Sequence, residues 1–484
     1  MAFDYHTIVI GSGSGGFTVA IGLTGLGKKV AVLERKWVGG DCTNVGCVPS
    51  KTLIHEAAER QTAVAALKTV QTKRDHLRDE EAAQLDHVNN LDLIYGSGRF
   101  LDPHRLEVEL NDGGRREISA EYIVIATGSR PRMVEIGGLP AARALTNETL
   151  FELADAPKHL AIVGSGAVGM EMAFAFRKLG SEVTLLSRSA RVLTKSAPEA
   201  SEAVHASMID KGIAPHYNVK PQSYDAATQT LHITADGHPL AISGVDMVLL
   251  ASGRVRNIDN LQLERAGVTF DMKNGIAVDS YGKTSVPHIF AIGDVTPTSH
   301  YTHSANAQGR RVTQRIALPY LPAISAEPIY PSAIFSDPEV ATIGMSPDAI
   351  AKRFHPNLIK RVRVDMKTLD RGYTDAVEHG FVMVDTMRLT GKILGATIVG
   401  PHAGDMLTLF TLAITQGISL YKIYGLVFPY PTYSEGIKKA ADSYLRETLP
   451  HIKDEALAYV RYRFAGPPKH AARPKALPAS SNQH

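Results

Sequence analysis

Cysteine is almost missing from this chain of 484 residues, which contains only Cys42 and Cys47. Two thiols cannot build the disulfide framework of a secreted domain, so they favour a reducing, cytoplasmic setting and a redox-active pair. Long apolar runs are also missing. The nearest candidate, residues 160–176, contains Glu171 and is shorter than the ~20 uncharged residues that a bilayer needs. No secretory signal precedes the strand-like run at residues 7–10, so we expect no membrane-spanning segment.

A strong excess of charge of either sign is absent as well. The formal net charge is +3, which is too small to indicate a nucleic-acid partner or a membrane surface. Hydrophobic residues make up 44% of the chain and charged residues 21%, as in an ordinary soluble globular protein. At ~150 residues per domain, the length predicts about three domains.

The first motif that is present is a glycine-rich turn between a strand and a helix. Residues 7–10 form an apolar run, a helical segment follows to about Leu26, and a second apolar run covers residues 30–33. This order predicts a βαβ dinucleotide-binding unit, in which glycines let the backbone approach a pyrophosphate and a terminal carboxylate binds ribose. The glycines and the carboxylate are Gly11, Gly13, Gly16 and Glu34.

The same pattern occurs a second time, after the apolar run at residues 160–163. Its glycines are Gly164, Gly166 and Gly169. The ribose position holds Ser187 instead of an acid, with Arg188 and Arg191 beside it. Loss of the acid removes repulsion against a 2′-phosphate and an arginine can pair with one, which favours NADP over NAD. Against this preference, a glycine at the third position, here Gly169, is common in NAD-type fingerprints. The alternative interpretation of the two arginines is that both are merely solvated surface residues.

Both cysteines lie between these units, in residues 39–51, which also contain Gly40 and Lys51. Two small buried hydrophobic residues are the ordinary interpretation of free cysteines. Cysteines at a helix N-terminus beside a cation, however, have a lowered pKa and react as thiolates. On an ideal helix their Cα atoms would lie roughly 8.7 Å apart, beyond the ~7 Å limit of a disulfide. The pair therefore needs a distorted turn, for which Gly46 and Pro49 are plausible causes.

Further elements are read from local patterns. Residues 52–85 are alanine-rich and mostly helical, and residues 106–109 and 117–119 form a hairpin around Asn111–Gly114. Buried strands are predicted at residues 122–126, 248–251 and 289–292. Residues 406–420 form a long apolar segment, expected to be a core helix of a third domain.

Taken together, the motifs resemble those of the flavin-dependent pyridine nucleotide–disulfide oxidoreductases, over residues 7–446. The stretches that carry the resemblance are residues 39–51, both glycine fingerprints, and residues 126–128, 252–254, 291–294 and 335–339. It implies an α/β fold with two Rossmann-like dinucleotide-binding domains, for FAD and NAD(P), and a C-terminal α+β dimerisation domain. The expected FAD domain covers residues 1–149 and 276–329, the NAD(P) domain 150–275, the dimerisation domain 330–465 and a disordered tail 466–484.

The resemblance also implies roles for particular residues. FAD occupies the first fold of a homodimer, with Asp294 bonded to its ribityl chain; the other residues assigned to cofactor binding after the first fingerprint are Gly40, Lys51, Thr127, Gly128 and Gly253. Cys47 becomes the flavin-side thiolate and Cys42 attacks the substrate. Lys51 matches the family's lysine near the flavin and Glu171 its carboxylate partner, with two unrelated surface charges as the alternative.

The C-terminal motif departs from that of the disulfide reductases in the family. They carry a His-Pro pair followed by a glutamate, and the histidine serves the other subunit as acid and base. Here Tyr430 stands in place of the histidine, while Glu435 is retained. A phenol with a pKa of ≈ 10 is a poor base at neutral pH, although it can donate a hydrogen bond or contact a metal ion. Aromatic packing at the dimer interface is the alternative role.

A tyrosine at this position resembles the mercuric reductases, although their C-terminal cysteine pair and N-terminal metal-binding domain are not found here. The sequence thus predicts an FAD-dependent NAD(P)H oxidoreductase that passes electrons through Cys42 and Cys47 to a soft metal ion or a small disulfide-like acceptor. We assign no resident metal ligands. Dihydrolipoamide dehydrogenase is the alternative enzyme, and a flavin redox sensor or electron-carrier subunit is the alternative of another class. His303, after the flavin strand, is interpreted as structural.

Overall fold

The computed structural model describes residues 3–59, 61–297, 301–320 and 328–466. The chain divides into two compact units, Met1–Asp337 and Pro338–His484. Almost all of the tail predicted to be disordered, residues 467–484, lies outside the described residues. In the part that the structure describes, no helix is both long enough and apolar enough to cross a membrane.

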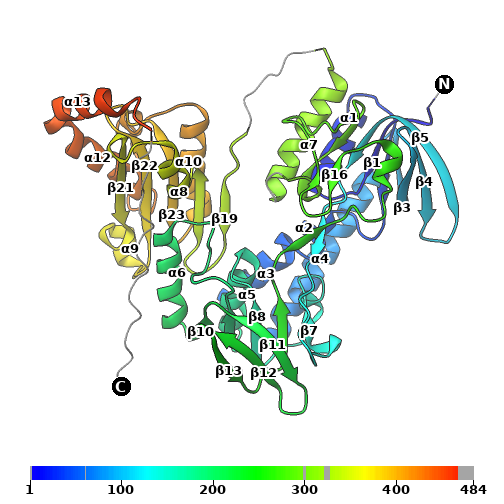
Figure 1. Ribbon diagram of the computed structural model, residues 1–484, viewed down its shortest axis with the longest axis horizontal. Coiled ribbons are helices and arrows are strands. Elements are labelled where there is room, and N and C mark those ends of the chain that lie inside the picture. The colour runs from blue at the N-terminus through cyan, green and yellow to red at the C-terminus, as the bar shows by residue number, and fades with distance from the viewer. Residues whose placement is uncertain (1–2, 60, 298–300, 321–327, 467–484) are drawn as a thin grey trace. The chain divides into compact units, whose positions relative to one another are not determined.

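The first unit contains a six-stranded sheet in the order β1-β2-β3-β4-β5-β18. β1 pairs in parallel with both β2 and β5, and β18 continues the parallel part beside β5. Helices α1 and α7 pack together against this sheet through apolar residues such as Val19 and Val312 (Figure 1). The elements are β1 (Tyr5–Ile10), α1 (Ser14–Thr24), β2 (Val30–Glu34), β3 (Leu91–Asp102), β4 (Arg105–Leu110), β5 (Arg115–Ile125), β18 (Ile289–Ala291), η4 (Gly293–Val295) and α7 (Thr302–Ala317). The predicted hairpin is confirmed, because β4 and β5 pair antiparallel.

A second sheet in the same unit has five strands in the order β10-β9-β8-β14-β7. Every pair in it is parallel, and a separate antiparallel sheet, β11-β12-β13, accompanies it (Figure 1). The second strand–glycine–helix unit is therefore confirmed as a second Rossmann-like fold. Its elements are β7 (Ala144–Leu145), β8 (His159–Val163), α5 (Ala167–Lys178), β9 (Glu182–Leu186), α6 (Pro198–Asp210), β10 (Ile213–His216), β11 (Lys220–Asp225), β12 (Thr230–Ala235), β13 (His238–Ile242) and β14 (Met247–Leu250).

The boundaries between the two folds differ from the predicted ones. β7 already belongs to the second sheet, so that fold begins before residue 150. The chain returns to the first fold near Arg254, not at residue 276, because β15 (Arg254–Arg256) pairs with β6 (Ser129–Pro131). Apolar residues after this crossing, including Ile258, Leu263 and Val268, pack into the same core as Tyr5 and Phe100. The boundary between the two folds is therefore set by the burial of these residues in the first core, which the local sequence pattern does not show.

The cysteine segment consists of helices with a break between them. α2 (Gly40–Asn44) is short, α3 (Cys47–Ala58) begins at the second cysteine, and α4 (Ala63–Asp86) follows. The predicted helical stretch 52–85 is thus confirmed, apart from an interruption before Ala63. The Thr62 side chain caps α4 by accepting a hydrogen bond from the Ala65 amide, and this cap fixes where α4 begins.

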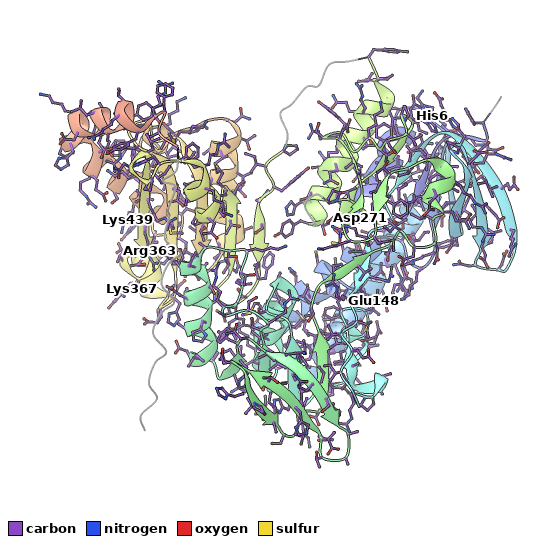
Figure 2. All side chains as sticks on the ribbon, in the orientation of Figure 1. His6, Glu148, Asp271, Arg363, Lys367 and Lys439 are labelled. Atoms are coloured by element: carbon purple, nitrogen blue, oxygen red, sulfur yellow. The ribbon has the colours of Figure 1, made fainter. Side chains whose placement is uncertain are left out.

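The second unit is an antiparallel sheet covered by helices, and this agrees with the predicted α+β domain. β20, β23, β22 and β21 lie side by side in that order. In Figure 2, Arg363 labels the edge strand β21, Lys367 follows it, and Lys439 labels helix α12. The predicted apolar helix 406–420 ends at Thr415, and Gly417 turns the chain with a φ of 65°. The main elements are β20 (Val340–Gly344), α8 (Pro347–Arg353), β21 (Ile359–Asp365), α9 (Asp370–Thr374), β22 (Phe381–Met387), β23 (Ile393–Val399), α10 (Ala403–Thr415), α11 (Leu420–Tyr424), α12 (Glu435–Thr448) and α13 (Ile452–Tyr462).

Candidate active site

The two cysteines are brought together by the break between α2 and α3. Cys42 lies on α2, Cys47 is the first residue of α3, and Gly46 connects them with a φ of −127° and a ψ of −114°. A Cβ on Gly46 would lie 2.7 Å from the Asp41 carbonyl oxygen, so no larger residue fits this reversal. Pro49 lies in the first turn of α3, where the missing N–H costs no helical hydrogen bond. Gly46 is thus the main local cause of the approach.

Both thiols are free, and their proton affinities differ strongly. The pKa of Cys47 is lowered to about 6, first by a hydrogen bond from Cys42, then by Thr302 and the charge of Lys51. The pKa of Cys42 is raised, because its proton is shared with Cys47 and because it is partly buried. At neutral pH Cys47 is therefore the thiolate and Cys42 the thiol.

Thr302 is a site residue that the sequence did not reveal. Its Oγ1 lies 3.4 Å from the Cys47 sulfur, although 255 positions separate the two residues. Thr302 begins α7 just after the strand that leads to Asp294. Its only signal in the sequence was its place beside His303. His303 itself donates Nε2–H to the Pro331 carbonyl oxygen at 2.8 Å, and its ring stacks on that of Tyr301.

Lys51 and Glu171 form the predicted ion pair. The Lys51 Nζ lies 3.0 Å and 2.8 Å from the two carboxylate oxygens. Glu171 is only 5% exposed although it lies inside the apolar helix α5, so two unrelated surface charges are excluded. The Phe335 amide donates to the same carboxylate at 3.1 Å, and its ring lies 4.6 Å from Nζ. The pair thus links the cysteine helix α3 with the second Rossmann-like fold.

The first glycine fingerprint fits a dinucleotide such as FAD. A Cβ on Gly16 would lie 2.0 Å from the Gly11 carbonyl oxygen, whereas the Cβ position of Gly13 meets only Gly40, at 3.9 Å. The turn is therefore packed on its inner side and open on the side where phosphates bind. Glu34 ends β2, is buried, and accepts hydrogen bonds from the Ser12 amide at 3.0 Å and hydroxyl at 2.7 Å.

Other predicted FAD residues gather at the carboxyl ends of the parallel strands. Thr127 and Gly128 follow β5, and Asp294 follows β18 beside it. Asp294 accepts a hydrogen bond from the Ser129 hydroxyl at 2.6 Å. Arg254, directly after Gly253, lies 3.6 Å from Asp294 and also pairs with Asp41, the neighbour of Cys42. Arg254 belongs to the motif 252–254 that carries the resemblance, but its ion pair with Asp41 on helix α2 is visible only in the structure.

The second fingerprint repeats the geometry of the first. A Cβ on Gly169 would lie 1.9 Å from the Gly164 carbonyl oxygen, and nothing lies within 4 Å of the Cβ position of Gly166. Ser187 is fully buried, and its hydroxyl lies 2.8 Å from that of Ser165. These residues fit a second dinucleotide.

The two arginines near Ser187 differ in their surroundings. Arg191 donates to the carbonyl oxygens of Thr194 and Ser196, at 3.1 and 3.3 Å, and so stabilises its own loop. Arg188 is exposed, and within the described residues it makes no hydrogen bond or ion pair. Of the two arginines, Arg188 is therefore the one whose guanidinium remains accessible.

The C-terminal motif lies in the second unit. Tyr430 is 69% exposed, and its hydroxyl donates to an Asp370 carboxylate oxygen at 2.5 Å. This hydrogen bond raises the pKa of Tyr430 above its ordinary value. Glu435 begins α12, and its Oε2 is buried without a hydrogen-bond partner in the part of the chain that the structure describes. Asp370, on α9, is a contact that sequence reasoning missed.

No group of three or more metal-ligating side chains occurs among the described residues.

Comparisons with known proteins agree with these features. The sequence model described as "pyridine nucleotide-disulphide oxidoreductase" matches residues 5–309, and the one for its dimerisation domain matches residues 330–441. The mercuric reductase of Lysinibacillus sphaericus is 34% identical over 460 residues, which cover 90% of this chain and 82% of that protein. The dihydrolipoyl dehydrogenase of Chlamydia trachomatis is 30% identical over 455 residues, 90% of this chain and 95% of that one.

A solved structure is similar over nearly the whole chain. It is the Cu(II) complex of the HOCl-induced flavoprotein disulfide reductase RclA from Escherichia coli, with a TM-score of 0.84 and 25% identity. The match covers 92% of this chain and 100% of that one.

Proposed function

Because the chain belongs to the pyridine nucleotide-disulphide oxidoreductase family, we propose that it reduces a thiophilic metal ion with electrons that enter from NADPH and pass through Cys42 and Cys47. FAD-dependent NAD(P)H oxidation through a redox-active disulfide is the activity of the family. The dimerisation domain supports a homodimer. The acceptor, the preference for NADPH and a cytoplasmic location are the inferred parts.

The residues around both fingerprints support the two cofactors. FAD, when bound, takes a hydride from the nicotinamide and passes two electrons on. Gly11, Gly13 and Asp294 would hold it in the first fold, and Lys51 would place a positive charge beside it. In the second fold, the absence of an acid at Ser187 and the exposed Arg188 favour NADPH, because a 2′-phosphate meets no repulsion and gains a cation.

The thiols divide the work according to their proton affinities. Two electrons break the bond between the two sulfurs, and one proton is taken up at neutral pH. That proton resides on Cys42, because the pKa of Cys47 is lowered to about 6 and that of Cys42 is raised. Lys51 balances the thiolate charge, and Glu171 holds the Lys51 side chain in place.

The hydrogen bond from Tyr430 to Asp370 is the observation that carries the choice of acceptor. A disulfide substrate needs a base that takes the Cys42 proton and later returns it to the leaving thiol. Tyr430 holds its own proton against the Asp370 carboxylate at 2.5 Å, so it is a poor base at neutral pH. A thiophilic ion needs no such base, because metal binding itself displaces a thiol proton to solvent.

The relatives support the same choice. The name of the mercuric reductases states that they act on a metal ion. RclA was solved as a complex with Cu(II). In the proposed reaction both thiolates bind the ion, and two electrons reduce one Hg(II) or two Cu(II) ions while the oxidised enzyme is regenerated. Tyr430 would act at the dithiol of the other subunit, where its oxygen, with its proton held by Asp370, contacts the ion.

Dihydrolipoamide oxidation is the second candidate, favoured by the 30% identity to a dihydrolipoyl dehydrogenase. The two functions are separated by NADPH oxidation with Hg(II), Cu(II), lipoamide and glutathione disulfide, each with wild type, Cys42→Ser and Tyr430→Phe. We expect turnover with a metal ion that is lost in Cys42→Ser, and little turnover with either disulfide. Good turnover of lipoamide would overturn the proposal. Reduction of the flavin without turnover of any acceptor would favour the redox-sensor alternative.

A further inference from the structure

Helix α13 exposes apolar side chains to solvent and buries a charged one, the reverse of an ordinary amphipathic helix. The one residue of the helix that is buried is the carboxylate Glu455, at 5% exposed. Leu457 and Val460 are each 70% exposed, and Phe464, just beyond the helix, is 89% exposed. Soluble proteins bury such side chains, so this face is expected to be covered when the protein functions.

The orientation of α13 is fixed by specific contacts. Glu455 accepts a hydrogen-bonded ion pair from Arg388 at 3.0 Å and lies 3.6 Å from the Lys360 ammonium. Two turns later, Tyr462 stacks on His355 with ring centroids 4.3 Å apart. Residues 455 and 462 occupy one face of the helix, whereas residues 457, 460 and 464 occupy another. The inner contacts therefore hold the apolar face outward.

The charge around this face indicates an anionic partner. Among the described residues from Ile452 onward, the exposed charges are the three cations Lys453, Arg461 and Arg463 and the single acid Asp454, so this surface is net positive. Arg461 and Arg463 are exposed next to the apolar side chains. Two copies of this surface would repel each other, and α13 lies beyond the matched dimerisation domain, which ends at residue 441. A second copy of the chain is thus a poor match.

We propose that α13 and Arg463, just beyond it, bind the surface of an anionic phospholipid bilayer. An exposed apolar face beside Lys and Arg side chains is typical of helices that lie in the headgroup region. Leu457, Val460 and Phe464 enter that region, while Arg461 and Arg463 contact the phosphates. Three apolar side chains beside these cations suffice for shallow, reversible binding. This inference is independent of the electron acceptor. It corrects the expectation drawn from the net charge of +3, which averages over the whole chain and does not show the local cluster of cations at α13.

The test is flotation of the full-length, FAD-loaded protein with phosphatidylcholine vesicles that either contain or lack phosphatidylglycerol. We expect binding to the phosphatidylglycerol vesicles only. The triple variant Leu457→Ser, Val460→Ser, Phe464→Ser is expected to weaken it by about tenfold or more. The matched control is Met133→Ser with Met272→Ser, which removes two apolar side chains that are 64% and 56% exposed in the other unit. The control should bind like wild type, and NADPH oxidation should be unchanged in both variants.

Several results would overturn the proposal. Absence of binding to phosphatidylglycerol vesicles would do so, and so would equal binding to vesicles without it. If the triple variant bound as tightly as wild type, charge alone would explain the binding and the apolar face would have no part. If the triple variant instead changed the oligomeric state in gel filtration with light scattering, a second copy would be the partner. Circular dichroism of the triple variant establishes that it is folded.

Discussion

Replacement of Cys42 by alanine is expected to raise the pKa of Cys47 by about one unit. That pKa is lowered to about 6, chiefly by the hydrogen bond from Cys42. A hydrogen bond to a charged group contributes about 1.5–3 kcal/mol, and one pKa unit corresponds to about 1.36 kcal/mol. We use the low end of this range because a thiol is a weak donor and Cys47 is exposed.

Cys42→Ser is the matched control for this change. Serine keeps a donor at the same place, and both variants leave Cys47 as the single thiol, so its titration is unambiguous. The lowered pKa means that the thiolate persists above about pH 6 and is lost as the pH falls through that value. At pH ~6.5 about three quarters of Cys47 is thiolate in the serine variant and about one quarter in the alanine variant.

The assay is the rate of alkylation of Cys47 by iodoacetamide as a function of pH. The alanine variant should react about three times more slowly at pH ~6.5 and equally fast at high pH. If both variants titrate at the same pH, the Cys42 hydrogen bond does not set the thiolate. Thr302→Val should then give the larger shift, because Thr302 is the other hydrogen-bonding contact that lowers this pKa.

Three further predictions concern other parts of the site. Glu171→Gln is expected to lower the pKa of Cys47 further, because the Glu171 charge raises it, and the pH dependence of alkylation measures this shift. The same change is expected to reduce the free energy of unfolding by about 1–2 kcal/mol, as measured by urea denaturation. Asp370→Asn should lower the pKa of Tyr430, because its carboxylate raises that pKa; the phenolate absorbance that Tyr430→Phe removes reports it, and an unchanged value would contradict the contact. Arg188→Ala should raise the KM for NADPH about tenfold and leave that for NADH unchanged; equal changes would deny it a role at the 2′-phosphate.

Local sequence patterns predicted the two nucleotide-binding units because each is determined by neighbouring residues. In both units only glycine fits at the third glycine position, because a Cβ there would lie 2.0 Å or less from the carbonyl oxygen of the residue five positions earlier. The ion pair of Lys51 and Glu171 was predicted as well, from the resemblance to the family, and the burial of Glu171 inside an apolar helix explains why that carboxylate needs a partner.

The parts that were missed depend on contacts between distant segments. Thr302 meets Cys47 across 255 positions, and Asp370 meets Tyr430 across 60, so neither has a local signal. The return to the first fold near Arg254 was placed too late for the same reason, because Ile258 and Val268 are ordinary apolar residues whose core is known only from the fold. The reversed faces of α13 likewise depend on Arg388, far away in the sequence.

The central claim is that electrons leave through Cys42 to a thiophilic metal ion. The most direct measurement is the ratio of kcat/KM for Hg(II) to that for lipoamide, with NADPH as the reductant, in wild type and in Cys42→Ser. We predict a ratio far above one in wild type, and loss of Hg(II) turnover in Cys42→Ser while NADPH still reduces the flavin. A ratio below one, or full Hg(II) turnover without the Cys42 thiol, would contradict the account.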